Sequence, residues 1–402
     1  MVRRREAIAG VGATLAGGLA GCTGFLDDTS SRGDGTTNAL ATSSGGGGQS
    51  SPTPTEMDFS GASWPTFGGG PRRRGRARDG TGPEAGGTVT WTTTVGDVAV
   101  YGPVVAGNTV FAAAGSRVAA HAAADGSTRW ERTGWTQANT PTFAGDALYV
   151  PNDGSGLAVL DPVSGETRWS LDAEGVVASP TVQDGTLYGV SPGRGVLEVD
   201  TESRERTGTI RTDTGHAIAV DGDALYVRGQ EALLVVEDAE VATRVGLPPA
   251  QAGYPVVGDG LVYVATCGDR EALVAVDPTS GETQWSRDTS VSCGLSGVVN
   301  PALADDVLVW AAGETVAALD PASGDEAWTT TLDSPRGVAV GGDTAYVAQS
   351  DGSLVALALD AGDERWRVSV QREDGVGTDQ PMVVGDRVYH HVGKRLAAVD
   401  PA

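Results

Sequence analysis

Short apolar runs, separated by turns rich in glycine, aspartate and proline, fill the chain from about residue 88 onward. One clear copy begins at Pro141 and has apolar runs over 148–150 and 157–160, with turn signals at Gly145-Asp146 and Asp153-Gly154. Runs of this length between such turns are typical of β-strands, and no strong helical period accompanies them. The pattern predicts an all-β fold built from repeats of about 39 residues.

Aromatic residues mark two positions of the repeat. The first position follows a Gly/Asp turn and is held by Phe111, Tyr149, Tyr188, Tyr226, Tyr263, Trp310, Tyr346 and Tyr389. The second opens the fourth run and is held by Trp91, Trp130, Trp169, Trp285, Trp328 and Trp366. The gap between Trp169 and Trp285 is about three periods long, so two copies lack the tryptophan.

An aspartate ends the third run of most copies. The aspartates are Asp161, Asp200, Asp238, Asp277, Asp320, Asp360 and Asp400. Stretches such as Asp161-Pro-Val-Ser-Gly-Glu166 predict hairpin turns, because proline fixes one φ, glycine supplies a positive one and aspartate accepts local backbone hydrogen bonds. Since nearly every copy carries this aspartate, we expect it to shape turns and not to act in catalysis.

The two ends of the repeat region complement each other. The last copy stops at Ala402 without a fourth run, whereas the strand at 88–94, which carries Trp91, has no first three runs before it. We therefore predict that the N-terminal strand completes the C-terminal sheet, which would close a ring and hide two strand edges. The expected fold is an eight-bladed β-propeller of four-stranded blades over residues 61–402.

The N-terminal residues predict export and anchoring. Arg3-Arg4-Arg5, a weakly apolar run over 7–20 and Leu19-Ala20-Gly21-Cys22 have the order of a twin-arginine-type lipoprotein signal over residues 1–22, with Cys22 as the lipidated residue. The alternative is a short buried helix ending in cysteine. Residues 23–60 are rich in Ser, Thr and Gly and are predicted to be a disordered tether. The expected location is the outer face of the cytoplasmic membrane.

The formal net charge is −24 with a single lysine, Lys394. Such a surface repels nucleic acid and anionic membranes, so neither is an expected partner beyond the lipid anchor. Adaptation to high salt explains the charge, because salt screens the self-repulsion. The composition resembles that of haloarchaeal proteins.

The repeat positions together resemble the PQQ-like β-propeller repeat family, over roughly residues 62–402. Ser63-Trp64-Pro65-Thr66-Phe67-Gly68 also resembles the lead-in before the first blade of such proteins. The resemblance implies that the tryptophans pack between neighbouring blades as structural residues. It implies no single activity, since the family contains quinoprotein dehydrogenases as well as non-enzymatic lipoproteins similar to BamB.

The second branch is favoured, because the chain has a lipobox and lacks both the adjacent cysteine pair and the long insertions of the dehydrogenases. The sequence is thus interpreted as a non-catalytic, monomeric surface scaffold for other surface or membrane proteins, with no catalytic, cofactor or metal residues assigned. Two alternatives stay open. One is a quinone-dependent dehydrogenase with calcium, and the other is a domain that binds a sugar or small ligand.

The remaining candidate residues are few. Cys267 and Cys293 are predicted to form a disulfide that closes about 25 residues, with two buried thiols as the alternative. His390 and His391 are adjacent in a strand and point to opposite faces, which argues against a shared metal. The only basic cluster is expected to pair with the protein's own carboxylates, or else to dock an acidic partner or lipid headgroups; it comprises Arg72, Arg73, Arg74, Arg76 and Arg78.

Overall fold

The computed structural model describes residues 56–402 apart from 97, 99, 153–155, 173–178, 192–193, 213–214, 216, 230, 248–250, 268–270, 289–298 and 372–379. These residues form antiparallel sheets and one short 3-10 helix, η1 (Phe67–Gly69). The all-β prediction is confirmed. No helix in this part of the chain has the length and hydrophobicity that a membrane span requires. The predicted signal, Cys22, Cys293 and most of the tether lie outside the described residues.

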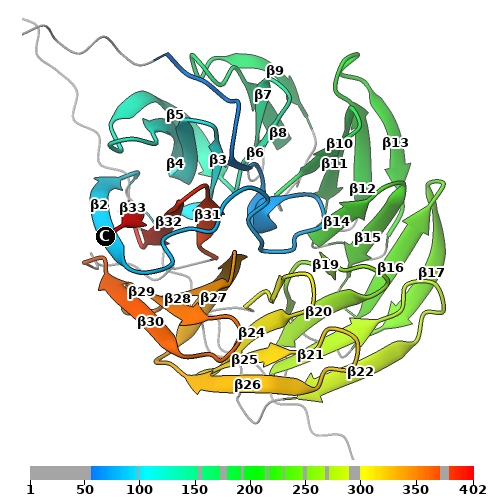
Figure 1. Cartoon of the computed structure of the whole chain (residues 1–402). Helices are drawn as coiled ribbons and strands as arrows, with labels where there is room; N and C mark the ends of the chain where they lie inside the picture. Colours follow the sequence, from blue (N-terminus) through cyan, green and yellow to red (C-terminus); the bar gives the residue numbers. More distant parts are fainter. Residues whose placement is uncertain are drawn as a thin grey trace, which may run out of the picture. The chain divides into compact units, whose positions relative to one another are not determined.

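Most sheets contain four strands that are adjacent in the chain, and in Figure 1 they follow one another in sequence order. Two of them are β10 (Thr181–Gln183), β11 (Thr186–Ser191), β12 (Gly195–Asp200), β13 (Arg206–Ile210), and β14 (Ala217–Asp221), β15 (Ala224–Arg228), β16 (Ala232–Glu237), β17 (Glu240–Gly246). The next comprises β18 (Gln251–Ala252), β19 (Val256–Val257), β20 (Val262–Cys267), β21 (Glu271–Val276) and β22 (Thr283–Asp288). Two more are β23 (Ala302–Leu303), β24 (Leu308–Ala312), β25 (Thr315–Leu319), β26 (Glu326–Thr331), and β27 (Pro335–Gly341), β28 (Thr344–Gln349), β29 (Ser353–Ala358), β30 (Glu364–Ser369).

The first two repeats join into one eight-stranded sheet. Its strands are β1 (Ser63–Trp64), β3 (Tyr101–Ala106), β4 (Thr109–Ala122), β5 (Thr128–Ala138), β6 (Thr142–Ala144), β7 (Ala147–Asn152), β8 (Gly156–Leu160) and β9 (Thr167–Leu171). A single register pair, Ala138 with Asn152, links the two repeats. The two separate four-stranded sheets that the sequence predicts here are therefore joined into one longer sheet.

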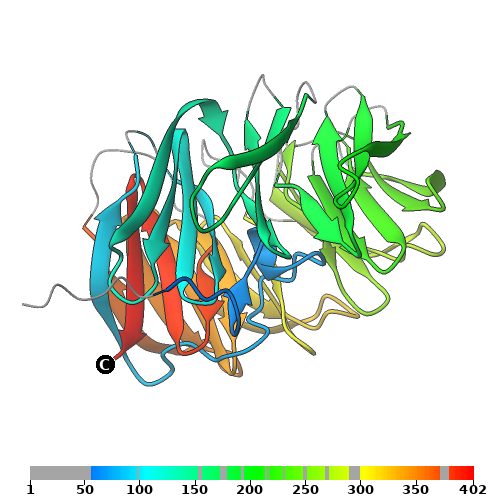
Figure 2. The same cartoon turned by 90° about the horizontal axis from the view of Figure 1, so that it is seen from above.

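The last sheet combines both ends of the repeat region. Its order is β2 (Gly87–Thr94), β33 (Arg395–Pro401), β32 (Arg387–Val392) and β31 (Met382–Val384). Thr88 pairs with Asp400 and Trp91 with Ala398 in antiparallel register. Figures 1 and 2 both show the cyan β2 beside the red β33. The N-terminal strand thus supplies the fourth strand of the C-terminal sheet, as the sequence predicts.

Burial falls from the inner strands of each sheet to the fourth strand. Every residue of β28 is buried, whereas β30 alternates between partly buried and exposed positions. Apolar clusters join neighbouring sheets: one contains Ala318 and Trp328 of the sheet β23–β26 together with Val338 and Val347 of the sheet β27–β30. Neighbouring sheets therefore pack through their apolar faces, which is the main source of burial free energy.

The lead-in segment, defined here as residues 61–86, follows the first strands of successive sheets. First-strand N–H groups donate hydrogen bonds to lead-in carbonyl oxygens in five pairs: Phe143 to Pro65, Val220 to Pro71, Val257 to Arg72, Leu303 to Arg74 and Val340 to Gly75. These bonds satisfy strand edges that would otherwise be open. In Figure 1 the blue lead-in segment runs past β6, β14 and β31.

The folded unit begins earlier than the sequence predicts. It spans Glu56–Ala402, and Phe59 packs against Phe111 and Phe143 at centroid distances of 6.0 and 5.1 Å. Asn108 N–H also donates to the carbonyl of Asp58 at 2.9 Å. Residues 56–60 therefore belong to the folded unit and not to the tether, because Phe59 finds an apolar contact that its polar neighbours in sequence do not indicate.

Candidate functional site: the seams between sheets

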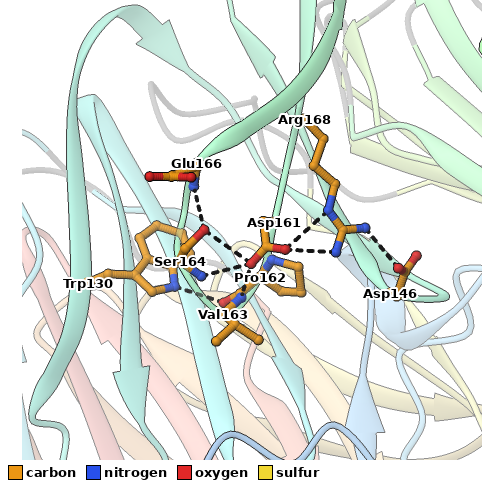
Figure 3. Close-up of polar contacts among 8 residues, drawn as sticks. All are labelled: Trp130, Asp146, Asp161, Pro162, Val163, Ser164, Glu166 and Arg168. Atoms are coloured by element: carbon orange, nitrogen blue, oxygen red, sulfur yellow. Dashed lines mark hydrogen bonds and ion pairs between the residues drawn. The ribbon is translucent and has the colours of Figure 1, made fainter.

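The turn between the third and fourth strands of a repeat, here called the docking turn, is held by its aspartate. At residues 161–166, Asp161 Oδ1 accepts hydrogen bonds from the backbone N–H of Val163 and Ser164, both at 2.9 Å (Figure 3). These bonds, with Arg168, hold the pKa of Asp161 below its usual value. A carboxylate used in this way shapes a turn and is not free for proton transfer.

The same turn recurs at Asp200, Asp277 and Asp320, whose carboxylates also accept backbone hydrogen bonds from the residues that follow them. Two of the predicted aspartates do not hold this position. Asp360 lies two residues past it, because Ala358 makes the equivalent hydrogen bonds with Gly362 and Asp363. Asp238 lies with Ala239 in a two-residue turn in which both φ angles are positive.

Several docking turns are the seat for a tryptophan of the preceding repeat. Trp130 Nε1 donates to the carbonyl of Pro162 at 2.8 Å (Figure 3). The ring lies so close to Gly165 that a Cβ there would be 2.6 Å from it. Gly165 has φ 70°, so this position requires glycine both for its backbone and for the indole.

Three further tryptophans occupy the same seat. Each Nε1 donates a hydrogen bond of 2.8 to 3.0 Å to the carbonyl of the second turn residue: Trp91 to Ala123, Trp285 to Pro321 and Trp328 to Leu359. Each ring also lies against the turn glycine, which is Gly126, Gly324 and Gly362 respectively. In the two copies without tryptophan, Gly208 and Thr243 stand at the indole position, and the Thr243 methyl lies against Gly281.

Trp366 docks on a turn that is shared between the two ends of the repeat region. Its Nε1 donates to the carbonyl of Pro83 at 2.7 Å, and a Cβ on Gly87 would lie 2.7 Å from its ring. Gly87 pairs with Pro401, so it stands where Gly165 stands in the continuous turn. The N-terminal and C-terminal parts of the repeat region are thus connected by the same tryptophan contact that connects other repeats.

Trp169 departs from this pattern. Among the described residues it makes no hydrogen bond through Nε1, and the glycine position of its turn is held by Arg204. The indole instead lines a pocket of about 430 Å³ with Tyr149, Arg168 and Thr201. Trp169 still packs between two sheets, against a cluster that contains Leu157 and Leu187, but it does not use the turn as its seat.

The basic cluster is divided between ion pairs and one buried group. Arg72 pairs with Asp221 and Asp259, and Arg74 pairs with Asp259 at 2.6 Å. Arg76 pairs with Asp305. The expectation that these arginines pair with the protein's own carboxylates is confirmed for these three, and an acidic partner is not needed to explain them.

Arg73 is 1% exposed and has no carboxylate partner in the described residues. Its guanidinium donates to the carbonyls of Phe67 and Ser179 and to the hydroxyls of Thr66 and Thr181, at 2.7 to 3.0 Å. Burial lowers its pKa to about 10. The sequence does not predict this position, because Arg72 and Arg74 beside it are only partly buried and nothing local distinguishes Arg73 from them.

His390 and His391 are fully buried in β32, and burial lowers their pKa values to about 3 and about 4. They are therefore neutral core residues at neutral pH. The described residues contain no group of three or more His, Cys, Asp or Glu side chains placed to hold a metal ion. Cys267 is disulfide-bonded, and its pairing with Cys293 stays a prediction because residue 293 lies outside the described part of the chain.

The repeats match a known protein family. The family model described as "Outer membrane protein assembly factor BamB" matches residues 114–209, 204–339 and 312–402. A serine/threonine-protein kinase AfsK from Streptomyces griseus is 32% identical over 146 residues, which is 34% of this chain but only 17% of that protein. Its activity therefore does not carry over.

Solved structures share the fold at low identity. BamB from Moraxella catarrhalis has a TM-score of 0.60 and 16% identity, covering 78% of this chain and 99% of that one. The quinohemoprotein alcohol dehydrogenase ADHIIG from Pseudomonas putida HK5 has a TM-score of 0.65 and 12% identity, covering 84% and 80%. Since both identities are low and one of the two proteins is an alcohol dehydrogenase whereas the other is BamB, these similarities concern the fold alone.

Proposed function

This chain belongs to the PQQ-repeat family described as outer membrane protein assembly factor BamB, and from that premise we propose that it is a non-catalytic interaction scaffold. In this proposal the repeats close into an eight-bladed ring, a lipid on Cys22 holds the chain at the outer face of the membrane, and the ring presents surfaces to other surface or membrane proteins. Loops and grooves on a rigid scaffold are the usual contact sites.

Closure of the ring is supported by the contacts at the two ends of the repeat region. β2 pairs with β33 over seven register pairs, and Trp366 docks on the turn built from Pro83 and Gly87. A sheet completed by both ends removes two free edges and couples the first repeat to the last. A rigid disc follows from this arrangement, and rigidity lowers the entropic cost of binding a partner.

The observation that carries the proposal is the position of the lead-in segment. Its backbone hydrogen-bonds the first strands of five sheets, and Arg73 binds carbonyl and hydroxyl groups around it. The polar groups at this end of the first strands are thereby used within the protein itself. In this proposal the turns and seams of the described residues are the surfaces that contact a partner.

A quinone titration separates this proposal from the dehydrogenase alternative. The full chain, shown to be folded by circular dichroism in high salt, is titrated with pyrroloquinoline quinone in the presence of Ca²⁺. Dye reduction with simple alcohols is then measured, and a quinoprotein dehydrogenase is run in parallel as the positive control. We expect neither stoichiometric binding nor dye reduction. Binding with turnover would establish the dehydrogenase and remove the scaffold proposal.

A further inference from the structure

We call a seam docked where a tryptophan sits on a turn glycine as Trp130 does. The seam after Trp169 differs from the docked seams at this glycine position, which Arg204 holds. Its docking turn keeps the usual backbone bonds, Arg204 N–H to Asp200 O at 2.8 Å and Asp200 N–H to Glu205 O at 3.0 Å. Arg204 also keeps the left-handed backbone, with φ 64° against 70° at Gly165. The turn therefore follows the same path, but it carries a side chain where the docked seams have none.

A side chain at this position excludes the indole. In the docked seams, a Cβ on the turn glycine would lie 2.4 to 2.7 Å from a tryptophan ring atom. Non-bonded carbon atoms do not approach so closely, since their optimal separation is about 3.5 to 4.0 Å. Trp169 cannot take the seat that Trp130 takes, and this explains why its Nε1 makes no bond to the turn.

The displaced indole leaves a groove between the sheet that contains β6–β9 and the sheet β10–β13. Its volume is about 430 Å³, and its wall includes Trp169, Tyr149, Thr201, Glu202 and Arg204. This volume lies in the range of about 300 to 1,000 Å³ that is typical of ligand pockets. A non-glycine residue in the left-handed region is strained, and retained strain is a recognised indication of function.

The docked seams show what this indole binds elsewhere in the same molecule. In each of them the ring face covers a glycine and Nε1 donates to a turn carbonyl. The arginines of the groove also bear on the charge of its occupant. Arg168 in the groove is held by Asp146 and Asp161, whereas the exposed Arg204 makes no ion pair within the described residues. A carboxylate on the occupant would complement it.

We propose that this groove binds a glycine-containing acidic turn of a partner protein. The Trp169 ring covers the partner's glycine, Trp169 Nε1 donates to a partner carbonyl, and Arg204 pairs with a partner carboxylate. The inference rests on the proposed scaffold function and names the chemistry of one contact site for it. The partner turn enters the groove beside the chain's own turn and meets the indole as the turn does in the docked seams.

The test uses a cyclic peptide with the sequence of residues 161–167, Asp-Pro-Val-Ser-Gly-Glu-Thr, and a matched peptide with arginine in place of the glycine. Binding of each fluorescently labelled peptide to the full chain is measured by polarisation. We expect the glycine peptide to bind at least tenfold more tightly than the arginine peptide. Equal affinities, or no binding by either peptide, would overturn the proposal.

Two variants assign the binding to the groove. Arg204→Gly is expected to let Trp169 dock, so that the melting temperature rises and peptide affinity falls at least tenfold. Trp169→Ala is expected to lose the same affinity without that stabilisation. Arg206→Ala, which removes a neighbouring exposed arginine outside the groove wall, is the matched control and should keep full affinity.

If the folded Arg204→Gly protein bound the peptide with unchanged affinity, the peptide would not bind in this groove and the proposal would be wrong. Binding of a saccharide such as maltose, with no binding of the glycine peptide, would assign the groove to a different ligand and also overturn the proposal. Failure here is distinguishable from failure of the scaffold function. If protein neighbours are still crosslinked to the chain in cells, only the groove is lost; if none is found, the scaffold function itself fails.

Discussion

The glycine of the docking turn serves two purposes at once, and a pair of alanine substitutions separates them. Gly165 and Gly145 both have positive φ, 70° and 60°, but only Gly165 has an indole within reach of a new Cβ. We expect Gly145→Ala to cost about 1 kcal/mol for its backbone alone. Gly165→Ala is expected to cost about 2 to 3 kcal/mol more, because it also displaces Trp130.

Thermal or chemical denaturation of the two variants measures this difference. Equal destabilisation by the two substitutions would mean that the indole contact contributes nothing to stability. Gly145 is a suitable control because a Cβ added there would have no heavy atom within 4 Å apart from those of its chain neighbours.

The buried histidines predict a loss of stability in mild acid. The unfolded chain protonates histidine near pKa 6.5, whereas burial holds the pKa of His390 at about 3 and that of His391 at about 4. Between pH 6.5 and 4 the unfolded state binds more protons, so stability falls as pH falls, by about 1.4 kcal/mol per pH unit for each histidine. His391 and Asp351 act on the pKa of His390 in opposite directions.

His390→Gln removes one of these sites while keeping a polar side chain of similar size. Its free energy of unfolding, followed by denaturant titration from pH 6.5 to 4.5, should fall less steeply than that of the unchanged protein, by about 1 kcal/mol per pH unit. An identical slope in both proteins would show that His390 does not contribute to the acid sensitivity.

Part of the docking turns is predictable from the sequence alone. The aspartates at 161, 200, 277 and 320 are predictable as turn residues because residue type and spacing determine a local turn. Asp360 is misplaced when the spacing is counted between aspartates; counting back eight residues from Trp366 gives Ala358. Arg204, at the glycine position, is visible in the sequence, but its consequence depends on an indole from the preceding sheet.

At the scale of elements, the lead-in segment is the part that the sequence describes least well. Its lead-in character is recognisable from Ser63-Trp64-Pro65, yet its contacts join residues more than 100 positions apart, such as Arg73 with Ser179. Local patterns contain no information on such contacts. The same limit applies to β5 and β7, whose single bridge merges two expected sheets into one.

Two neighbouring arginines test the importance of this segment. Arg73→Met leaves buried carbonyl and hydroxyl groups without their donor and is expected to cost about 3 kcal/mol or more. Arg72→Ala removes ion pairs at a half-exposed side chain and is expected to cost less than about 1 kcal/mol. Melting temperatures of the two variants decide the matter, and a larger loss for Arg72→Ala would contradict the described burial of Arg73.

At the scale of the whole molecule, charge dominates the response to the medium. A net charge of −24 produces self-repulsion that salt screens over a distance of about 10 Å at 0.1 M and less at higher concentrations. We expect the melting temperature to rise between about 0.01 and 0.3 M sodium chloride, the range in which screening dominates. A flat or falling melting temperature across this range would show that repulsion between carboxylates does not limit stability.

The central claim is that this family member works by contacting other proteins, and crosslinking in intact cells tests it most directly. A photoreactive residue is placed in the full chain at Val163, Glu202 or Val241; both valines are large exposed apolar residues, and Glu202 lies on the groove wall. We predict one or two reproducible protein adducts, with the Glu202 adduct lost in Arg204→Gly. Absence of protein adducts from every position, in cells that display the folded chain, would contradict the account.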